Sequence, residues 1–89
     1  MRECRRYLIQ GRVQGVCYRM SAQQTGIQYG LTGWVRNLPN GDVEAIACGD
    51  ADNLKRFERW LWQGPQMAEV KSVNVETVHE GPYNDFLIR

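Results

Sequence analysis

The chain has 89 residues, a length that fits a single domain. Its hydrophobic content of 43% and charged content of 24% are typical of a folded domain and exclude a disordered tail. The net charge of +1 gives no bulk attraction to nucleic acid, and the longest apolar run is far short of the roughly 18 residues that a membrane span requires.

Positive charge is concentrated in the N-terminal half. Residues 1–41 carry six arginines against one acid, Glu3, whereas residues 42–89 carry five basic and nine acidic residues. The planar fork of an arginine can hold two oxygens of a phosphate or carboxylate. We therefore expect an anion site in the N-terminal half, with most of these arginines remaining solvated surface charges. The six are Arg2, Arg5, Arg6, Arg12, Arg19 and Arg36.

The first third of the chain predicts a strand, a loop and a helix. Residues 4–10 contain aromatic and branched side chains and predict a strand that ends at Gly11. Residues 11–15 hold two glycines and predict a loop. Residues 18–29 are mostly small or polar, without proline, and predict a helix that Gly30 ends. Gly26 inside this helix costs about 1 kcal/mol relative to alanine.

A β-hairpin is predicted next. Residues 33–38 and 42–48 form its strands, because the Pro39-Asn40-Gly41-Asp42 segment between them combines a preset φ with a tolerance of positive φ. Alternation along the second strand places Val43, Ala45 and Ala47 on one face.

The rest of the chain predicts a second helix and two more strands. Asp50 or Asp52 can cap this helix, and Gly64-Pro65 ends it. Valines then mark a long strand over residues 70–79, and residues 86–88 predict a short final strand. The apolar stripe of the helix consists of Leu54, Phe57 and Leu61.

The order of these elements is β-α-β-β-α-β with a terminal strand added. It predicts a single domain over residues 1–89 of the α+β class, a ferredoxin-like split βαβ sandwich. In that arrangement both helices cover one face of a mainly antiparallel sheet. The first strand then lies between the third and fourth strands and runs antiparallel to the third.

Three cysteines occur, Cys4, Cys17 and Cys48, and they form neither a disulfide framework nor a zinc-binding spacing with the lone His79. We therefore expect no metal. The predicted strand pairing places Cys4 beside Cys48 on the face away from the helices, with Cα atoms about 4.4–6.8 Å apart. No secretory leader pattern is visible, which predicts the cytosol, where both would usually remain thiols.

The segment over residues 11–19 is the candidate for chemistry. Backbone N–H groups at a helix N-terminus bind anions, and glycines let the backbone curl around the ligand. Arg19, at the start of the helix, can add a charge-assisted contact. The alternative is a tight turn with incidental glycines and a surface arginine. Cys17 is not favoured as a nucleophile, because a cysteine phosphatase loop needs its arginine farther along the chain.

Two motifs carry a family resemblance. Gly-Arg-Val-Gln-Gly-Val at residues 11–16, followed by Arg19, resembles the first signature of the acylphosphatase family. Gly-Trp-Val-Arg-Asn at residues 33–37, followed by Gly41, is similar to the second. The resemblance implies a small enzyme, without metal or other cofactor, that hydrolyses acyl phosphates to a carboxylate and inorganic phosphate.

The same resemblance implies roles for individual residues. The catalytic arginine of the family maps onto Arg19 and its catalytic asparagine onto Asn37. The phosphate-binding cradle maps onto Arg12, Val13, Gln14, Gly15, Val16, Cys17 and Tyr18.

The expected partner is a small-molecule acyl phosphate, with no nucleic acid and no membrane, bound by a monomer. Two alternatives stay open. Ferredoxin-like sheets also bind RNA through aromatic side chains, for which Trp34 and Tyr7 are candidates, although no RNA-binding motif is present. A domain of this kind can also keep the phosphate cradle and serve as a sensor or accessory unit.

Overall fold

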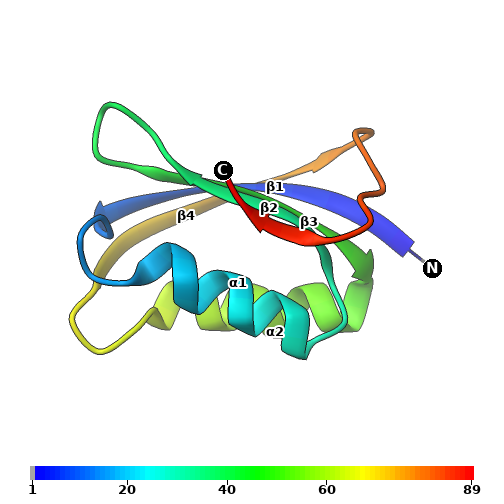
Figure 1. The fold of residues 1–89 in the computed structure, drawn as a ribbon, viewed down its shortest axis with the longest axis horizontal. Helices are drawn as coiled ribbons and strands as arrows, with labels where there is room; N and C mark the ends of the chain where they lie inside the picture. The colour runs from blue at the N-terminus through cyan, green and yellow to red at the C-terminus, as the bar shows by residue number, and fades with distance from the viewer. Residues whose placement is uncertain (1) are drawn as a thin grey trace.

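In the part of the chain that the structure describes, a five-stranded sheet carries both helices on one face (Figure 1). The computed structural model describes residues 2–89. Its elements are β1 (Arg2–Arg12), α1 (Tyr18–Gln28), β2 (Thr32–Asn37), β3 (Val43–Asp50), α2 (Ala51–Gln63), β4 (Glu69–Val78) and β5 (Phe86–Ile88).

The strand order β4-β1-β3-β2-β5 confirms the predicted ferredoxin-like topology. β1 lies between β3 and β4 and is antiparallel to both, and β2 is antiparallel to β3. The added strand β5 pairs with β2 in parallel at the far edge. The loop after β1 and the hairpin between β2 and β3 therefore lie at the same end of the molecule, on the left in Figure 1.

The core lies between the sheet and the two helices. Alternation along β1 and β3 turns Tyr7, Ile9, Val43, Ala45 and Ala47 toward the helices, as predicted, and all five are fully buried. They meet the apolar stripe of α2, whose three members are also fully buried: Leu54, Phe57 and Leu61.

Helix α1 ends as the sequence predicts. Gly30 has a positive φ of 68°, and its N–H donates to Ile27 O while Leu31 N–H donates to Gly26 O. This pair of bonds satisfies carbonyls that the end of a helix leaves free. Gly26, predicted only as a cost to the helix, has a packing role, because a Cβ there would lie 2.5 Å from the ring of Phe86 on β5.

The sheet face away from the helices is covered by ion pairs and an apolar cluster. Glu44 on β3 is 4% exposed and pairs with Arg6 of β1 and Arg36 of β2. Farther along, Trp34 and Ile46 pack against Cys48. This second layer explains why β3 is buried on both faces, whereas the sequence predicted burial of one face.

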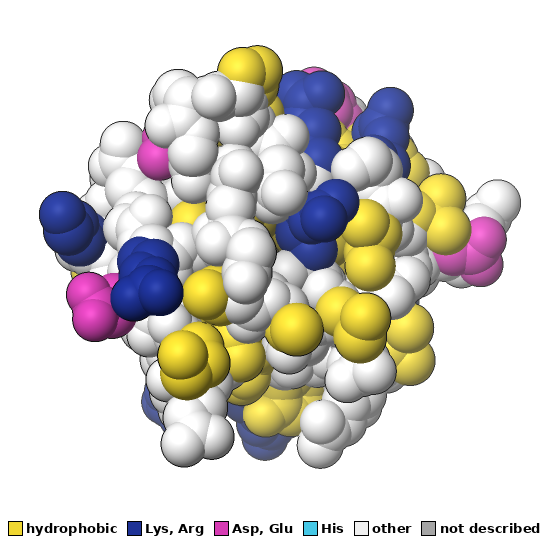
Figure 2. Space-filling model, turned by 60° about the vertical axis from the view of Figure 1, so that its left-hand side comes forward, with side chains coloured by type: hydrophobic (Ala, Val, Ile, Leu, Met, Phe, Trp, Pro, Cys, Tyr) yellow, Lys and Arg dark blue, Asp and Glu magenta, His cyan; other side chains and the backbone are white. Residues whose placement is uncertain are grey.

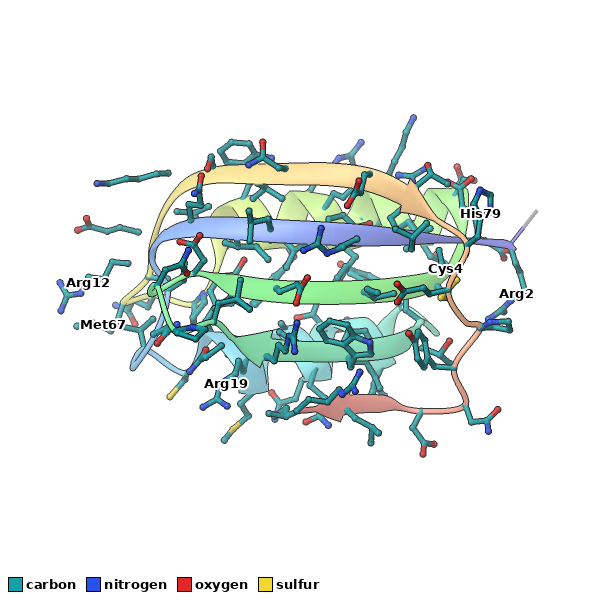
Figure 3. All side chains as sticks on the ribbon, turned by 90° about the horizontal axis from the view of Figure 1, so that it is seen from above. Arg2, Cys4, Arg12, Arg19, Met67 and His79 are labelled. Atoms are coloured by element: carbon teal, nitrogen blue, oxygen red, sulfur yellow. A yellow bond between two sulfur atoms is a disulfide. The ribbon has the colours of Figure 1, made fainter. Side chains whose placement is uncertain are left out.

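Cys4 and Cys48 are register partners in the β1–β3 ladder, and their sulfurs form a disulfide. Their Cα atoms are 4.0 Å apart, which confirms that the two residues are neighbours and falls just below the predicted interval. The expectation that both remain thiols is wrong for this structure, because facing positions of two paired strands bring the sulfurs into contact. Figure 3 shows Cys4 at the opposite end of the sheet from Arg19.

Helix α2 starts directly after Asp50, one of the two predicted caps, although the Asp50 carboxylate makes no capping hydrogen bond. Neither helix among residues 2–89 combines the length and apolarity needed to cross a membrane.

Candidate active site

The loop that follows β1 begins later than the sequence predicts. β1 continues through Gly11 to Arg12, with a bulge between Gln10 and Gly11. Gly11 has φ 132°, and a Cβ there would lie 2.2 Å from Glu69 O on β4. The glycine therefore serves the close approach of two strands, and the free loop spans only residues 13–17.

The loop backbone presents a row of unused donors. Gly15 and Cys17 have positive φ values of 73° and 64°, so the chain curls at both residues before it enters α1. Within the described residues, the N–H groups from Gln14 to Arg19 have no hydrogen-bond acceptor, and the first bond of the helix runs from Ser21 N–H to Cys17 O. A curled row of free N–H groups that leads into a helix N-terminus is suited to an anion.

A pocket of about 330 Å³ opens at this loop and joins the two sequence motifs. Arg19 enters it from the first turn of α1, and Asn37 enters it from the last residue of β2. The Arg19 guanidinium makes no ion pair with a described residue. The pocket is lined by Val13, Gly15, Cys17, Tyr18, Arg19, Met20, Asn37 and Ile88.

Asn37 reaches the pocket because of strand alternation. Gly33, Val35 and Asn37 face the helices, and β2 ends beside the N-terminus of α1. The Asn37 Oδ1 atom is buried and accepts no hydrogen bond from the described residues. A buried acceptor without a partner costs about 1–3 kcal/mol, so a water or substrate group that donates to Oδ1 would remove this cost.

Comparison with known proteins decides the family. The family model described as acylphosphatase matches residues 5–88. The chain belongs to the acylphosphatase family.

Individual members are similar over nearly the whole chain. An acylphosphatase of Vibrio parahaemolyticus is 43% identical over 86 residues, which cover 97% of this chain and 96% of the relative. The solved acylphosphatase of Coxiella burnetii superimposes with a TM-score of 0.95 at 42% identity, over 99% of this chain and 93% of that one. The solved acylphosphatase of Bacillus subtilis gives 0.94 at 30% identity, over 100% and 99% of the two chains.

The residues mapped onto the acylphosphatase cradle do not all face the pocket. Val13, Gly15, Cys17 and Tyr18 line it. Arg12 is exposed and extends outward from the end of the sheet, away from Arg19 (Figure 3). Val16 is partly buried against the core. For Arg12 and Val16, only the backbone can belong to the cradle.

The side chain of Gln14 contacts the β2–β3 hairpin. Its Nε2 donates to Leu38 O and to Asp42 O, both at 2.8 Å. These carbonyls belong to the β2–β3 hairpin, so the amide ties the loop to the segment that follows Asn37. Its backbone N–H remains free for an anion.

The side chain of Tyr18 is a core residue at 1% exposure. Its hydroxyl donates to Leu61 O at 2.6 Å, and its ring packs 5.4 Å from that of Trp60. Burial raises the pKa of this phenol above its ordinary value. The side chain of Tyr18 therefore fixes the start of α1 on α2, while its backbone N–H remains free at the loop.

Two pocket residues were not found from the sequence, Met20 on α1 and Ile88 on β5. Met20 adjoins Arg19 in the first turn of the helix, which was an available signal. No comparable signal existed for Ile88, because its position depends on the parallel pairing of β5 with β2.

No metal centre is evident in the part of the chain that the structure describes: residues 2–89 contain no group of three His, Cys, Asp or Glu side chains placed to hold an ion.

Proposed function

We propose that this chain hydrolyses the carboxyl–phosphate bond of small-molecule acyl phosphates, with the loop over residues 12–18 binding the phosphoryl group and Arg19 and Asn37 acting as catalytic residues. Membership of the acylphosphatase family supports the reaction. The observation that carries the site is the meeting of Arg19, Asn37 and a row of free N–H groups in one pocket.

The backbone of the loop and the Arg19 side chain would bind the phosphoryl group. The N–H groups between Gln14 and Arg19 would donate to the non-bridging oxygens, and the guanidinium would add a charge-assisted contact. Hydrogen bonds that involve a charged group contribute about 1.5–3 kcal/mol each. Phosphoryl transfer depends mainly on positioning and on stabilising charge at these oxygens, which this arrangement supplies.

Asn37 would orient the attacking water. Its amide can accept from and donate to the water, but it is too weak a base to remove a proton. The water oxygen forms a bond to phosphorus while the bond from phosphorus to the carboxyl oxygen breaks, and the electron pair leaves on the carboxylate. The proton of the water ends on the released phosphate. A carboxylate is a good leaving group, which fits a pocket whose lining residues include no acid and no histidine.

The test is hydrolysis of acetyl phosphate in the presence of EDTA, with wild type compared to Arg19→Gln and Asn37→Ala. We expect turnover without added metal and a loss of at least about 100-fold in either variant, as for removal of a preorganised donor. Arg59→Gln, on the exposed surface of α2, is the matched control. Turnover near that of wild type in Arg19→Gln would refute the assigned roles.

RNA binding receives no support from the sheet. Tyr7 faces the helices and is fully buried, and Trp34 is covered by the guanidinium groups of Arg36 and Arg89 at 5.2 and 4.8 Å from its ring centroid. Filter binding with single-stranded RNA at physiological salt tests this alternative, and we expect no retention. The accessory-domain alternative predicts phosphate binding without turnover, so the EDTA assay tests it as well.

We further propose that the protein acts as a cytoplasmic monomer. The structure holds a disulfide between Cys4 and Cys48. Disulfides are rare in a reducing cytosol, so the location of the protein in the cell requires a direct measurement. Cell fractionation tests the location, and sedimentation of the purified chain tests the oligomeric state.

A further inference from the structure

One side of the candidate active site is apolar and open to solvent. Met20 on α1 is 55% exposed and Ile88 on β5 is 40% exposed, yet both line the pocket that holds Arg19 and Asn37. The two residues are 68 positions apart in the sequence and line the same pocket because α1 packs against β5. Figure 2 faces the end of the molecule with the loop and shows apolar side chains gathered next to basic ones.

The polar groups of the pocket would contact only the phosphoryl part of an acyl phosphate. The free N–H groups, Arg19 and Asn37 serve the phosphoryl group and the water. The volume of about 330 Å³ leaves room for the acyl group beside it. The surfaces left for that group include Val13, Met20 and Ile88, all of which are apolar.

We propose that Met20 and Ile88 bind the acyl group and select acyl phosphates with an apolar aliphatic chain over acetyl phosphate. This inference rests on the proposed function. Contact with an alkyl chain would remove apolar surface of both partners from water, and each buried methylene favours binding.

A charged acyl group is not favoured by the same pocket. Arg19 is the only charged side chain among the described residues that line the pocket, and the phosphoryl group would occupy it. A second carboxylate or phosphate on the substrate would therefore lie against Met20 or Ile88 without a partner, at the cost of its hydration.

A homologous series tests the selectivity. Acetyl, propionyl, butyryl and hexanoyl phosphate share nearly the same leaving group, so kcat/KM reports contact with the chain rather than reactivity. We expect kcat/KM to rise about two- to fourfold per methylene, and at least tenfold from acetyl to hexanoyl phosphate.

Two polar substitutions that nearly keep the size of the side chain test whether Met20 and Ile88 contact the acyl group. In Met20→Gln and in Ile88→Thr we expect the ratio of hexanoyl to acetyl kcat/KM to fall at least threefold, while inhibition by inorganic phosphate stays within twofold. The matched controls are Met67→Gln and Leu87→Thr, which change exposed residues outside the pocket. Figure 3 shows Met67 separated from Arg19.

The outcomes separate the two proposals. A series with equal kcat/KM values, or a ratio that falls as far in Met67→Gln as in Met20→Gln, overturns the acyl contact and leaves the proposed hydrolysis standing. Absence of turnover for every member of the series overturns the proposed function and the acyl contact with it.

Discussion

The side-chain amide of Gln14 donates a 2.8 Å hydrogen bond to the backbone carbonyl of Leu38, the residue that follows Asn37. The same nitrogen donates to Asp42 O at 2.8 Å, and Leu38 N–H donates to that carbonyl as well. One side chain thus joins the loop after β1 to the two residues that follow β2 and precede β3, Leu38 and Asp42. We therefore expect the relative position of the loop and Asn37 to depend on this contact.

We predict that Gln14→Met lets Asn37, and with it the attacking water, shift relative to the bound phosphoryl group. Methionine matches glutamine in length but cannot donate, so the hairpin is released while the loop N–H groups and Arg19 are unchanged. We expect kcat to fall about tenfold or more, with the inhibition constant of inorganic phosphate within threefold of wild type. Steady-state kinetics checks both values.

The control for this variant is Gln24→Met on the exposed surface of α1, which we expect to leave both constants unchanged. A Gln14→Met protein that loses phosphate binding and kcat together would contradict a positioning role and point to collapse of the loop.

We expect the Asn37 side chain to be required for turnover and to lower the free energy of unfolding. Its buried Oδ1 has no partner among the described residues. We predict that Asn37→Ala loses turnover, yet keeps a free energy of unfolding equal to that of wild type or up to about 1 kcal/mol higher, because the unpaired acceptor is removed. Urea denaturation measures this value.

Asn74→Ala on the exposed surface of β4 controls for the loss of an asparagine side chain. If Asn37→Ala unfolds at a clearly lower urea concentration than Asn74→Ala, the Asn37 side chain stabilises the fold and this expectation is wrong.

Local patterns predicted the elements well because each depends on near neighbours. Gly30 ends α1 through bonds to the preceding turn, and the stripe on α2 is visible at its spacing of three and four residues. The disulfide partners followed from topology and alternation together. Arg19 and Asn37 meet in one pocket because the motifs that contain them lie at the ends of elements that the fold brings together.

Contacts between distant side chains could not be predicted in this way. The sequence near Tyr18 gives no sign that its hydroxyl reaches Leu61 O on α2. Likewise, nothing near Gln14 in the sequence indicates that its side chain donates to carbonyls 24 and 28 positions away. Such contacts are set by packing in three dimensions.

Gly26 provides a test of packing against helix propensity. Alanine should stabilise an exposed helix by about 1 kcal/mol over glycine, but here its Cβ would lie 2.5 Å from the Phe86 ring. Overpacking of this kind costs about 1–3 kcal/mol. We predict that Gly26→Ala lowers the free energy of unfolding, measured by thermal or urea denaturation.

A second substitution checks the cause. In the background Phe86→Leu, where the ring is absent, Gly26→Ala should become neutral or stabilising. The same loss in both backgrounds would show that the ring of Phe86 is not responsible.

The ion pairs around Glu44 predict an acid-sensitive contribution to stability. Burial alone would raise the pKa of this carboxyl, but hydrogen bonds from Arg36 and Arg6 outweigh it and hold the pKa below its ordinary value of 4.5. The Glu44 carboxylate therefore binds a proton more readily in the unfolded chain than in the folded protein. The contribution is complete above about pH 4.5 and is lost as the pH falls through the lower pKa of the folded state.

The matching experiment compares Glu44→Gln with wild type by denaturation over a range of pH. Since Arg6 and Arg36 are partly solvated, we expect the variant to lose about 1–3 kcal/mol at neutral pH and the difference to shrink below about pH 4.5. Glu76→Gln, whose carboxylate is exposed and pairs with the same Arg6, should lose less than about 1 kcal/mol. Equal losses in the two variants would show that burial of Glu44 adds nothing.

Reduction of the Cys4–Cys48 disulfide should affect stability without affecting catalysis. The bond links residues 44 positions apart, and opening it restores conformational freedom to the unfolded chain, a change of about 2–4 kcal/mol. We expect dithiothreitol to lower the urea midpoint accordingly. Because Cys4 lies at the opposite end of the sheet from Arg19 (Figure 3), kcat and KM under native conditions should stay within twofold. The comparison is made in a Cys17→Ser background, which removes the free thiol that lines the pocket. A change in KM on reduction in this background would mean that the two ends of the sheet are coupled.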